Sequence, residues 1–438
     1  MSVPATGNIT LTGINTVFGK GATFSLNSYA GTTVYDVTTG ASTTLGATSV
    51  GSMRTAFLNK TPLGQVTKPT VTVAENASVA SGGLSNCVTI SWSTPGGATP
   101  SGYTVQVSTD GTTFTALTTP TSTSTTHTPT SNTRYWYRIR ATTAGAVGAW
   151  STTSGVAVFP NQTTTPTFVP PTTSTYITFT GAAGGMGSGS SDLYRAFGIR
   201  FANLQVLSTL PTYTMSFGTA GGQKNAGAGI SSLTAGSYTI SGGAGGYGYN
   251  INCGGGGGAS IIADTDLNYF VVGGGGGQGD KGRAGYPGGA GGGGTITYNG
   301  SSGTAGTGDG NVVGGTGAGL GGGGGGYGGA GGSGANNNGG AGGNVSSTNN
   351  GNITLVFGSG GQGVTDGNYG GGGGGGGFAG GGGGAAAANN PGWGGRYFAG
   401  GGGGGSTNLS ITNPFASTPT SSAMTTNYVC GGWAYAVW

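Results

Sequence analysis

Long uninterrupted glycine runs constrain this chain more than any other feature. Glycine fills 108 of the 438 positions, and runs of four or more recur through the second half. These runs occupy residues 254–258, 273–277, 291–294, 321–326, 370–377, 380–384 and 400–405. Because glycine has no Cβ, backbones can approach one another closely at such runs. The chain is therefore either a flexible linker there or a set of extended, closely packed backbones.

Two further features favour the packed alternative. The runs alternate with short apolar segments of β-like composition, such as "ASIIADTDLNYFVV" (259–272) and "NITLVFGSG" (352–360). The chain also ends in "NYVCGGWAYAVW", an aromatic segment that needs a packed environment. We expect polyglycine-II helices, which have three residues per turn, about 3.1 Å rise per residue and no internal hydrogen bonds. Their N–H and C=O groups must then bond to neighbouring segments.

Charge is scarce along the whole chain. Charged residues make up 5% of it, against about 25% in an average globular protein. Because no basic stripe is present to neutralise phosphate groups, we expect no nucleic-acid partner. The N-terminus lacks a basic segment followed by an apolar one, so no secretory signal is expected. No apolar stretch reaches the roughly 20 residues of a membrane-spanning helix, so we expect no membrane span.

Metal-binding and redox motifs are not apparent. Cys87, Cys253 and Cys430 are too few for a disulfide framework. A bridge between the last two stays open, beside the alternative of two buried thiols. Asp264 and Asp266 favour a solvated turn over a calcium site, because the spacing of a calcium-binding loop is missing. The sequence therefore predicts no metal and no other cofactor.

The only histidine, His127, lies in "TSTSTTHTPT", which we expect to be a loop of a β-domain. A catalytic histidine needs an orienting acid and a nucleophile, and the neighbouring residues supply neither. We therefore expect no catalytic residues and no enzymatic activity.

Residues 1–64 are expected to form a small N-terminal module. Short alternating segments fill its first half, and "TSVGSMRTAFLNKT" (48–61) has the spacing of one short helix. Together with "ITLTGINTVFG" (9–19) and "SLNSY" (25–29), this segment resembles the N-terminal modules of tailed-phage virion proteins, particularly tail-fibre and appendage proteins. The chain departs from that pattern at Val17, where the family has Glu. The resemblance implies that residues 1–64 attach to other virion proteins and carry no chemistry.

Residues 65–160 contain strand-like segments at the spacing of a β-sandwich. They are "VTISWSTP", "GYTVQVSTDGTTFTAL", "TRYWYRIRATTAGAVGAWS" and "GVAVF", with Asp110 and Gly111 at a hairpin turn. With Trp92 in an early strand, this pattern resembles a fibronectin type III domain, which implies a spacer. One face of the third segment carries Tyr135, Tyr137, Ile139 and Ala141, and the other carries Trp136, Arg138 and Arg140.

A Thr/Pro-rich linker over residues 161–175 precedes the glycine-rich region, residues 176–438. That region contains "FTGAAG" from Phe179, "LTAGSYTI" from Leu233, "GGGGGAS" and "FVVGGGGG". These motifs resemble the glycine-rich domain of anaplastic lymphoma kinase-type receptors. The resemblance implies one domain of β-strands with a bundle of polyglycine-II helices. The expected fold class is thus mainly β throughout.

Aromatic and amide side chains gather where the glycine runs turn. Such side chains either seal the edges of the bundle or form a contact surface at its tips, as loops on a rigid scaffold do. In the second interpretation the receptor contacts are Asn336, Asn337, Asn338, Asn389, Asn390, Trp393, Arg396, Tyr397 and Phe398.

The module order predicts a non-enzymatic virion appendage: a tail fibre or adhesin of a tailed phage. It would bind a host-surface glycan or protein, lie outside the cell after lysis, and form a homo-oligomer, with a trimer favoured. A bacterial cell-surface or filament adhesin is the first alternative. An ice-binding polyglycine bundle is the second, although the glycine runs lack a regular threonine repeat.

Overall fold

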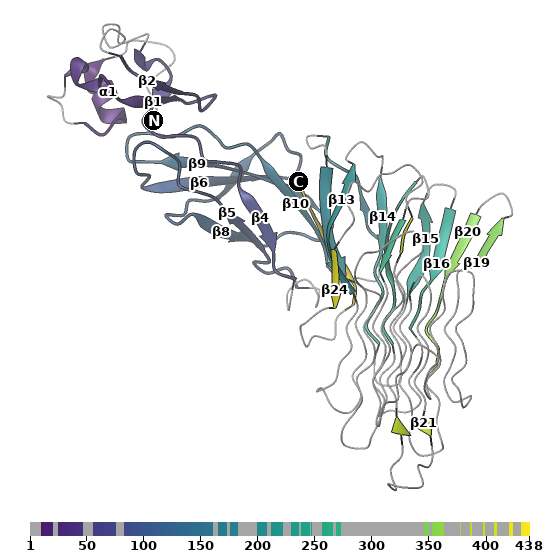
Figure 1. Ribbon diagram of the computed structural model, residues 1–438. Coiled ribbons are helices and arrows are strands. Elements are labelled where there is room, and N and C mark those ends of the chain that lie inside the picture. Colours follow the sequence, from purple (N-terminus) through teal and green to yellow (C-terminus); the bar gives the residue numbers. More distant parts are fainter. Residues whose placement is uncertain are drawn as a thin grey trace. The chain divides into compact units, whose positions relative to one another are not determined.

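The computed structural model describes residues 10–20, 25–46, 56–75, 83–160, 165–172, 176–182, 199–207, 212–221, 229–235, 238–245, 247, 256–265, 269–272, 346–349, 353–362, 377, 386–387, 397–398, 407–409, 420–423 and 431–438. Within these residues the protein is mainly β, and its helical elements are short (Figure 1). The predicted fold class is confirmed at this level.

Contacts between residues divide the chain into two compact units. The first comprises residues 1–74, 85–157 and 437, and the second comprises residues 75–84, 158–436 and 438. The N-terminal module and most of the predicted β-domain fall in the first unit. The glycine-rich region falls almost entirely in the second.

The N-terminal module combines two short helical elements with a small antiparallel sheet of order β2-β1-β3. Its elements are α1 (Leu11–Val17), the 3-10 helix η1 (Leu26–Tyr29), β1 (Thr33–Asp36), β2 (Ser42–Thr44) and β3 (Lys60–Thr61). Phe18, Tyr29 and Phe57 meet edge to face in its core, with ring centroids 5.0 to 5.6 Å apart. Edge-to-face pairs of aromatic rings stabilise a fold in addition to the stabilisation that comes from burying their apolar area.

The helix α1 corrects the prediction of alternating, strand-like segments at the start of the chain. Thr10 caps it, because its Oγ1 accepts a hydrogen bond from the Gly13 N–H at 3.1 Å. Ile14 and Val17 then lie three residues apart on one buried face. Of the short helix predicted over 48–61, Ala56 and Phe57 are helical, and residues up to 55 lie outside the described ranges.

The β-domain (residues 65–160) contributes two antiparallel sheets to the first unit. One has the order β4-β5-β8, and the other contains the run β10-β9-β6-β7. The strands are β4 (Thr70–Val73), β5 (Val88–Ser91), β6 (Gly102–Ser108), β7 (Thr115–Thr118), β8 (Ser124–His127), β9 (Arg134–Thr142) and β10 (Ser154–Phe159). Each of the four segments predicted to form strands contains at least one, and the predicted hairpin joins β6 to β7.

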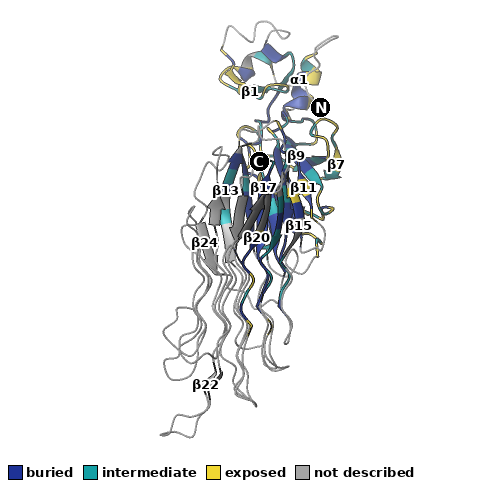
Figure 2. Cartoon of the chain, turned by 90° about the vertical axis from the view of Figure 1, so that its right-hand side faces the viewer, coloured by how far each residue is buried: buried dark blue, intermediate teal, exposed yellow. Residues whose placement is uncertain are grey.

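Side chains from both sheets form the core of the β-domain. Tyr137 and Ile139 on β9 are fully buried, as is Ile90 on β5. Trp92, directly after β5, meets the Tyr103 ring of β6 edge to face, with centroids 5.2 Å apart. Because β9 alternates with period two, the face that carries Tyr135, Tyr137, Ile139 and Ala141 points into this core. Figure 2 shows the buried residues along these strands.

The N-terminal module is joined to the β-domain through main-chain contacts. The Gly64 N–H donates to the Gly96 carbonyl at 2.9 Å, and the Ala98 N–H donates to the Pro62 carbonyl at 3.0 Å. A Cβ built on Gly148 would lie only 2.8 Å from the Gly64 carbonyl oxygen. The joint therefore depends on glycine at positions where two backbones meet.

The second unit contains several sheets. One holds the run β24-β13-β12-β25, and the others have the orders β11-β14-β17-β18-β23, β15-β16-β20-β19 and β21-β22. The strands are β11 (Thr167–Phe168), β12 (Tyr176–Ala182), β13 (Ile199–Leu207), β14 (Tyr213–Ser216), β15 (Ile230–Ala235), β16 (Tyr238–Gly242), β17 (Ser260–Asp264), β18 (Tyr269–Val272), β19 (Ser346–Asn349), β20 (Ile353–Phe357), β21 (Ala386–Ala387), β22 (Tyr397–Phe398), β23 (Thr407–Leu409), β24 (Thr420–Ala423) and β25 (Trp433–Val437).

The sheet β11-β14-β17-β18-β23 contacts both the sheet that holds β13 and the sheet that holds β15. β13 contacts β18, and both β14 and β17 contact β15. Between the first two sheets the Phe179 ring meets Phe168 at 5.5 Å and Tyr213 at 5.9 Å. The Trp438 ring joins this cluster, with its centroid 5.9 Å from that of Phe168. The aromatic end of the chain is thus buried, as its composition predicts.

Candidate functional site

Main-chain hydrogen bonds link the glycine-rich segments of the second unit outside its regular strands. Each bond joins segments that are far apart in sequence, so the backbone groups of one segment are satisfied by another. The bonds run from Gly258 N to Thr219 O (3.0 Å), Ala259 N to Gly243 O (2.8 Å), Gly360 N to Ala244 O (2.7 Å), Gly377 N to Gly358 O (3.1 Å) and Gly432 N to Gly218 O (2.6 Å).

Two glycines of these segments, Gly218 and Gly245, leave no room for a side chain. A Cβ built on Gly218 would collide with the Gly258 carbonyl group and lie 2.6 Å from the Ala259 carbonyl oxygen. A Cβ on Gly245 would collide with the Gly256 carbonyl group. Since these obstacles are backbone atoms rather than flexible side chains, the segments can approach this closely only as glycine. The arrangement can provide stiffness, but it offers no functional side chains of its own.

The predicted receptor contacts lie almost entirely outside the described residues. Tyr397 and Phe398 are the exception: their backbone forms β22, and they pair with Ala387 and Ala386 of β21. In Figures 1 and 2, this two-stranded sheet lies at the end of the second unit farthest from β13 and β20. The other predicted contacts, which the structure does not describe, are Asn336, Asn337, Asn338, Asn389, Asn390, Trp393 and Arg396.

A row of arginine and aromatic side chains lies on the outer face of the β-domain. The Arg138 guanidinium lies 4.1 Å from the Phe114 ring centroid and 4.5 Å from that of Trp150, and Arg140 lies 4.4 Å from Trp150. Arg138 also donates from Nε and Nη2 to Gln106 Oε1, at 2.9 and 2.7 Å. We call Phe114, Arg138, Trp150 and Arg140 the arginine row.

The surroundings of the arginine row disfavour the charged forms of its two guanidinium groups. Burial lowers the pKa of Arg138, and the neighbouring Arg140 charge lowers it further. Burial alone lowers the pKa of Arg140. Sequence analysis placed both arginines on one strand face but missed the row itself. Phe114 and Trp150 come from the β6–β7 turn and the segment before β10, so no local spacing links them to β9.

His127 is the last residue of β8, which corrects its prediction as a loop residue. Its Nδ1 lies 2.8 Å from the Tyr137 hydroxyl, and its ring meets that of Tyr135 edge to face at 4.9 Å. Burial lowers the pKa of His127. The imidazole is thus a partner for buried tyrosines inside the β-domain.

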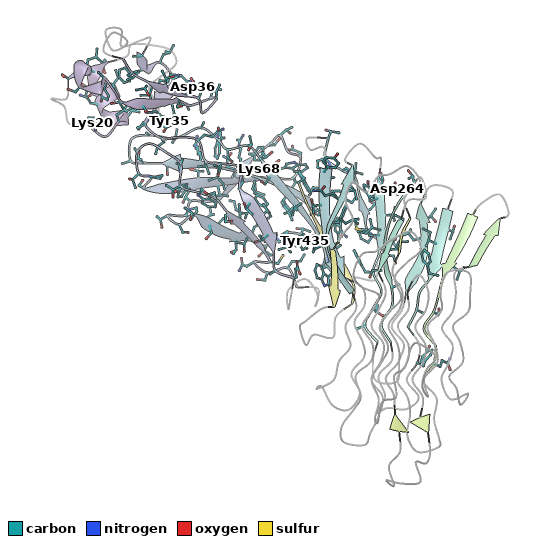
Figure 3. All side chains as sticks on the ribbon, in the orientation of Figure 1. Lys20, Tyr35, Asp36, Lys68, Asp264 and Tyr435 are labelled. Carbon is teal, nitrogen blue, oxygen red and sulfur yellow. The ribbon has the colours of Figure 1, made fainter. Side chains whose placement is uncertain are left out.

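Asp264 is also placed differently from the prediction of a solvated turn. It ends β17, where it pairs with Tyr213 of β14, and it is only 1% exposed. Burial, together with the nearby Asp264, raises the pKa of the Tyr213 hydroxyl. Figure 3 labels Asp264 among the strands of the second unit. Asp266 lies outside the described residues, so of the two aspartates that a calcium site would need, the structure places only Asp264.

Among the residues that the structure describes, no three His, Cys, Asp or Glu side chains gather as a metal site would require. Cys87 is a buried free thiol whose pKa burial raises to about 11. Cys253 and Cys430 lie outside the described residues. In the described part of the chain, no helix has the length and apolar character needed to cross a membrane.

No protein-family model matches the chain, and no curated protein sequence matches it.

Proposed function

We propose that the protein is a structural, non-catalytic appendage of a tailed-phage virion that attaches the particle to its host cell. The main-chain bonding between glycine segments, at positions that admit no Cβ, is the observation that carries the proposal. Such packing makes a stiff support with a neutral, chemically inert surface. An extended appendage needs those properties, whereas an enzyme needs a pocket with functional side chains.

The finer architecture that we propose follows the family resemblances. The sheet β4-β5-β8 opposite the run β10-β9-β6-β7 has the strand order expected of a fibronectin type III domain. Bonds from Gly258 and Ala259 to two different segments, those of Thr219 and Gly243, support a polyglycine-II bundle. In such a bundle the backbone of one helix bonds to several neighbours. The β-domain then acts as a spacer and the glycine-rich region as a rigid arm.

Residues 1–64 would attach the protein to the particle and drive its assembly into a homotrimer, since closed symmetry is the rule for oligomers. Sedimentation equilibrium compares the full chain with a chain that begins at residue 65. We expect a trimer for the first and a monomer for the second. Trimers of both would move the assembly site to the β-domain or the glycine-rich region.

The location of the protein can be tested on particles. Antibodies raised against the purified chain are expected to label the tail appendages of phage particles in electron micrographs, and the purified chain should reduce adsorption of those particles to host cells. Label on the surface of bacteria that carry no phage would instead support the alternative of a bacterial surface adhesin.

Receptor contact is proposed at the tip of the glycine-rich region, next to β22. Trp393 and Arg396 are the strongest candidates, because binding surfaces concentrate aromatic and arginine side chains. Substituting both by Ala should reduce binding of the full chain to host cells at least about tenfold, which corresponds to a loss of about 1.4 kcal/mol. The melting temperature should stay unchanged. A drop in melting temperature with unchanged binding would assign both side chains to internal packing.

A further inference from the structure

The arginine row carries two positive charges without an anionic partner. Neither Arg138 nor Arg140 forms an ion pair with any residue that the structure describes. Arg138 spends two of its donors on a neutral amide oxygen of Gln106. Arg140 Nε is buried, and it has no hydrogen-bond partner among the described residues. Since solvent does not reach that Nε, the donors left to an external anion are the Nη groups of Arg140 and the Nη hydrogens of Arg138 that do not bond to Gln106.

Acidic residues near the row in sequence do not neutralise it. Asp110, in the β6–β7 hairpin, uses its Oδ1 to accept hydrogen bonds from the Ser108 hydroxyl and from the Thr112 and Thr113 N–H groups, all at 2.7 Å. The β-domain contains only one other acidic residue, Glu75. Since like charges two residues apart on a strand lie about 7 Å apart, an anion that contacts both guanidinium groups would relieve their repulsion.

Contacts with aromatic rings also restrain the guanidinium groups of the row. Aromatic rings flank the Arg138 guanidinium, and the ring of Trp150 lies near both arginines. Stacking leaves the plane of a guanidinium group available for hydrogen bonding. Since Gln106 occupies the Nε–Nη2 edge of Arg138, its Nη1–Nη2 end is the edge that can meet a carboxylate in a bidentate geometry. Less conformational freedom is then lost when an anion binds.

We propose that the arginine row binds an acidic polysaccharide, with sugar carboxylates on Arg138 and Arg140. The neighbouring side chains on β6 suit sugar hydroxyls: Thr104 lies opposite Arg140, and Gln106 lies opposite Arg138. Two charges are too few to hold a nucleic acid, which requires many phosphate contacts. This site does not rest on the proposed virion role, and it gives the β-domain a binding role beyond that of a spacer.

The test measures binding of the full chain to polygalacturonate, which carries a carboxylate on every sugar, and to neutral dextran of equal length. Isothermal titration calorimetry at low salt should detect binding to polygalacturonate and none to dextran. Because the contact is ionic, raising the salt concentration to 0.5 M should weaken the binding at least about tenfold. Failure of the wild-type chain to bind polygalacturonate at millimolar sugar concentration would overturn the proposal.

A matched pair of variants separates the arginine row from net charge. Arg138→Gln with Arg140→Gln removes two positive charges from the row, and Lys20→Gln with Lys68→Gln removes two from elsewhere in the first unit (Figure 3). The arginine variant should bind at least about tenfold more weakly, and the lysine variant within about twofold of wild type. Equal losses in both variants would overturn the proposal.

Two further measurements distinguish carboxylate recognition from a folding defect and from general binding of polyanions. Arg138→Lys with Arg140→Lys retains the charges and removes only the planar fork, so it should fold and still lose severalfold in affinity. Unchanged affinity in this variant would contradict carboxylate recognition by the guanidinium edges. Binding of a single-stranded DNA of equal charge as tightly as polygalacturonate would show general polyanion binding and overturn the assignment to a polysaccharide.

Discussion

The β-domain and the glycine-rich region solve the problem of packing in opposite ways. In the β-domain, large side chains such as Tyr137 and Ile139 fill the space between two sheets. In the glycine-rich region, segments such as those of Gly218 and Gly258 meet backbone to backbone and leave no space for a side chain. The two regions should therefore be destabilised by opposite kinds of substitution. Smaller side chains should destabilise the β-domain, and larger side chains should destabilise the glycine-rich region.

Loss of volume in the β-domain should give the largest effect. Tyr137→Ala would leave a cavity in the core and remove the hydroxyl partner of His127. We expect a loss of about 3–5 kcal/mol in the free energy of unfolding, as for other buried aromatic residues. Calorimetric unfolding of the full chain measures it. Thr115→Ala, at an exposed position of β7, is the control and should change stability by less than about 0.5 kcal/mol.

Added volume in the second unit should come next. Gly218→Ala places a methyl group against the Gly258 backbone, which cannot move aside as a side chain would. A destabilisation of about 3 kcal/mol is expected, at the upper end for overpacking. The control is Gly102→Ala in the β-domain, where a Cβ would lie 3.3 Å from the Pro120 carbonyl oxygen. If both substitutions cost the same, close backbone packing does not distinguish the two regions.

The joint between the N-terminal module and the β-domain tests whether glycine contacts matter outside the glycine-rich region. Gly148→Ala should disturb the Gly64 carbonyl and cost roughly 1–2 kcal/mol. A second calorimetric transition, in which the module unfolds separately, should appear. Ala144→Ser, at an exposed position of the same loop, is the control. A single unshifted transition in the Gly148 variant would mean that the joint tolerates a methyl group.

A polar contact in the N-terminal module should have a smaller effect. Tyr29→Phe removes the hydrogen bond of 2.8 Å from the Tyr29 hydroxyl to Asn15 Oδ1 and keeps the buried ring. A loss of about 1 kcal/mol is expected, the usual net value of such a bond. Chemical denaturation of wild type and variant measures it. A loss several times larger would show that the ring packing itself depends on this bond.

The smallest expected effect is a pH dependence. Burial lowers the pKa of His127, so the folded β-domain favours the neutral imidazole. The unfolded chain takes up the proton near pH 6.5. The stabilisation is therefore present above about pH 6.5 and is lost as the pH falls below that value. Because His127 is the only histidine, His127→Gln should remove the slope of stability between pH 7 and 5. An unchanged slope in this variant would assign the dependence to other groups.

Sequence analysis predicted best where the pattern is local and regular. The alternation on β9 put Tyr135, Tyr137, Ile139 and Ala141 on one face, and all four are buried. Asp110 with Gly111 correctly marked a hairpin. It failed at α1, where a single capping threonine and two apolar residues outweigh a strand-like composition. It also failed at Asp264, because no local signal shows that Tyr213 would lie beside it.

By itself, the sequence determined that the protein is mainly β and where β5, β6, β7, β9 and β10 lie, because strand periodicity is a property of adjacent residues. It also determined which backbones can approach closely, because only glycine lacks a Cβ. Tertiary structure alone decided which glycine segments bond to one another and which aromatic rings flank Arg138 and Arg140. Those contacts join residues from distant segments, and their partners are selected by packing in three dimensions rather than by spacing along the chain.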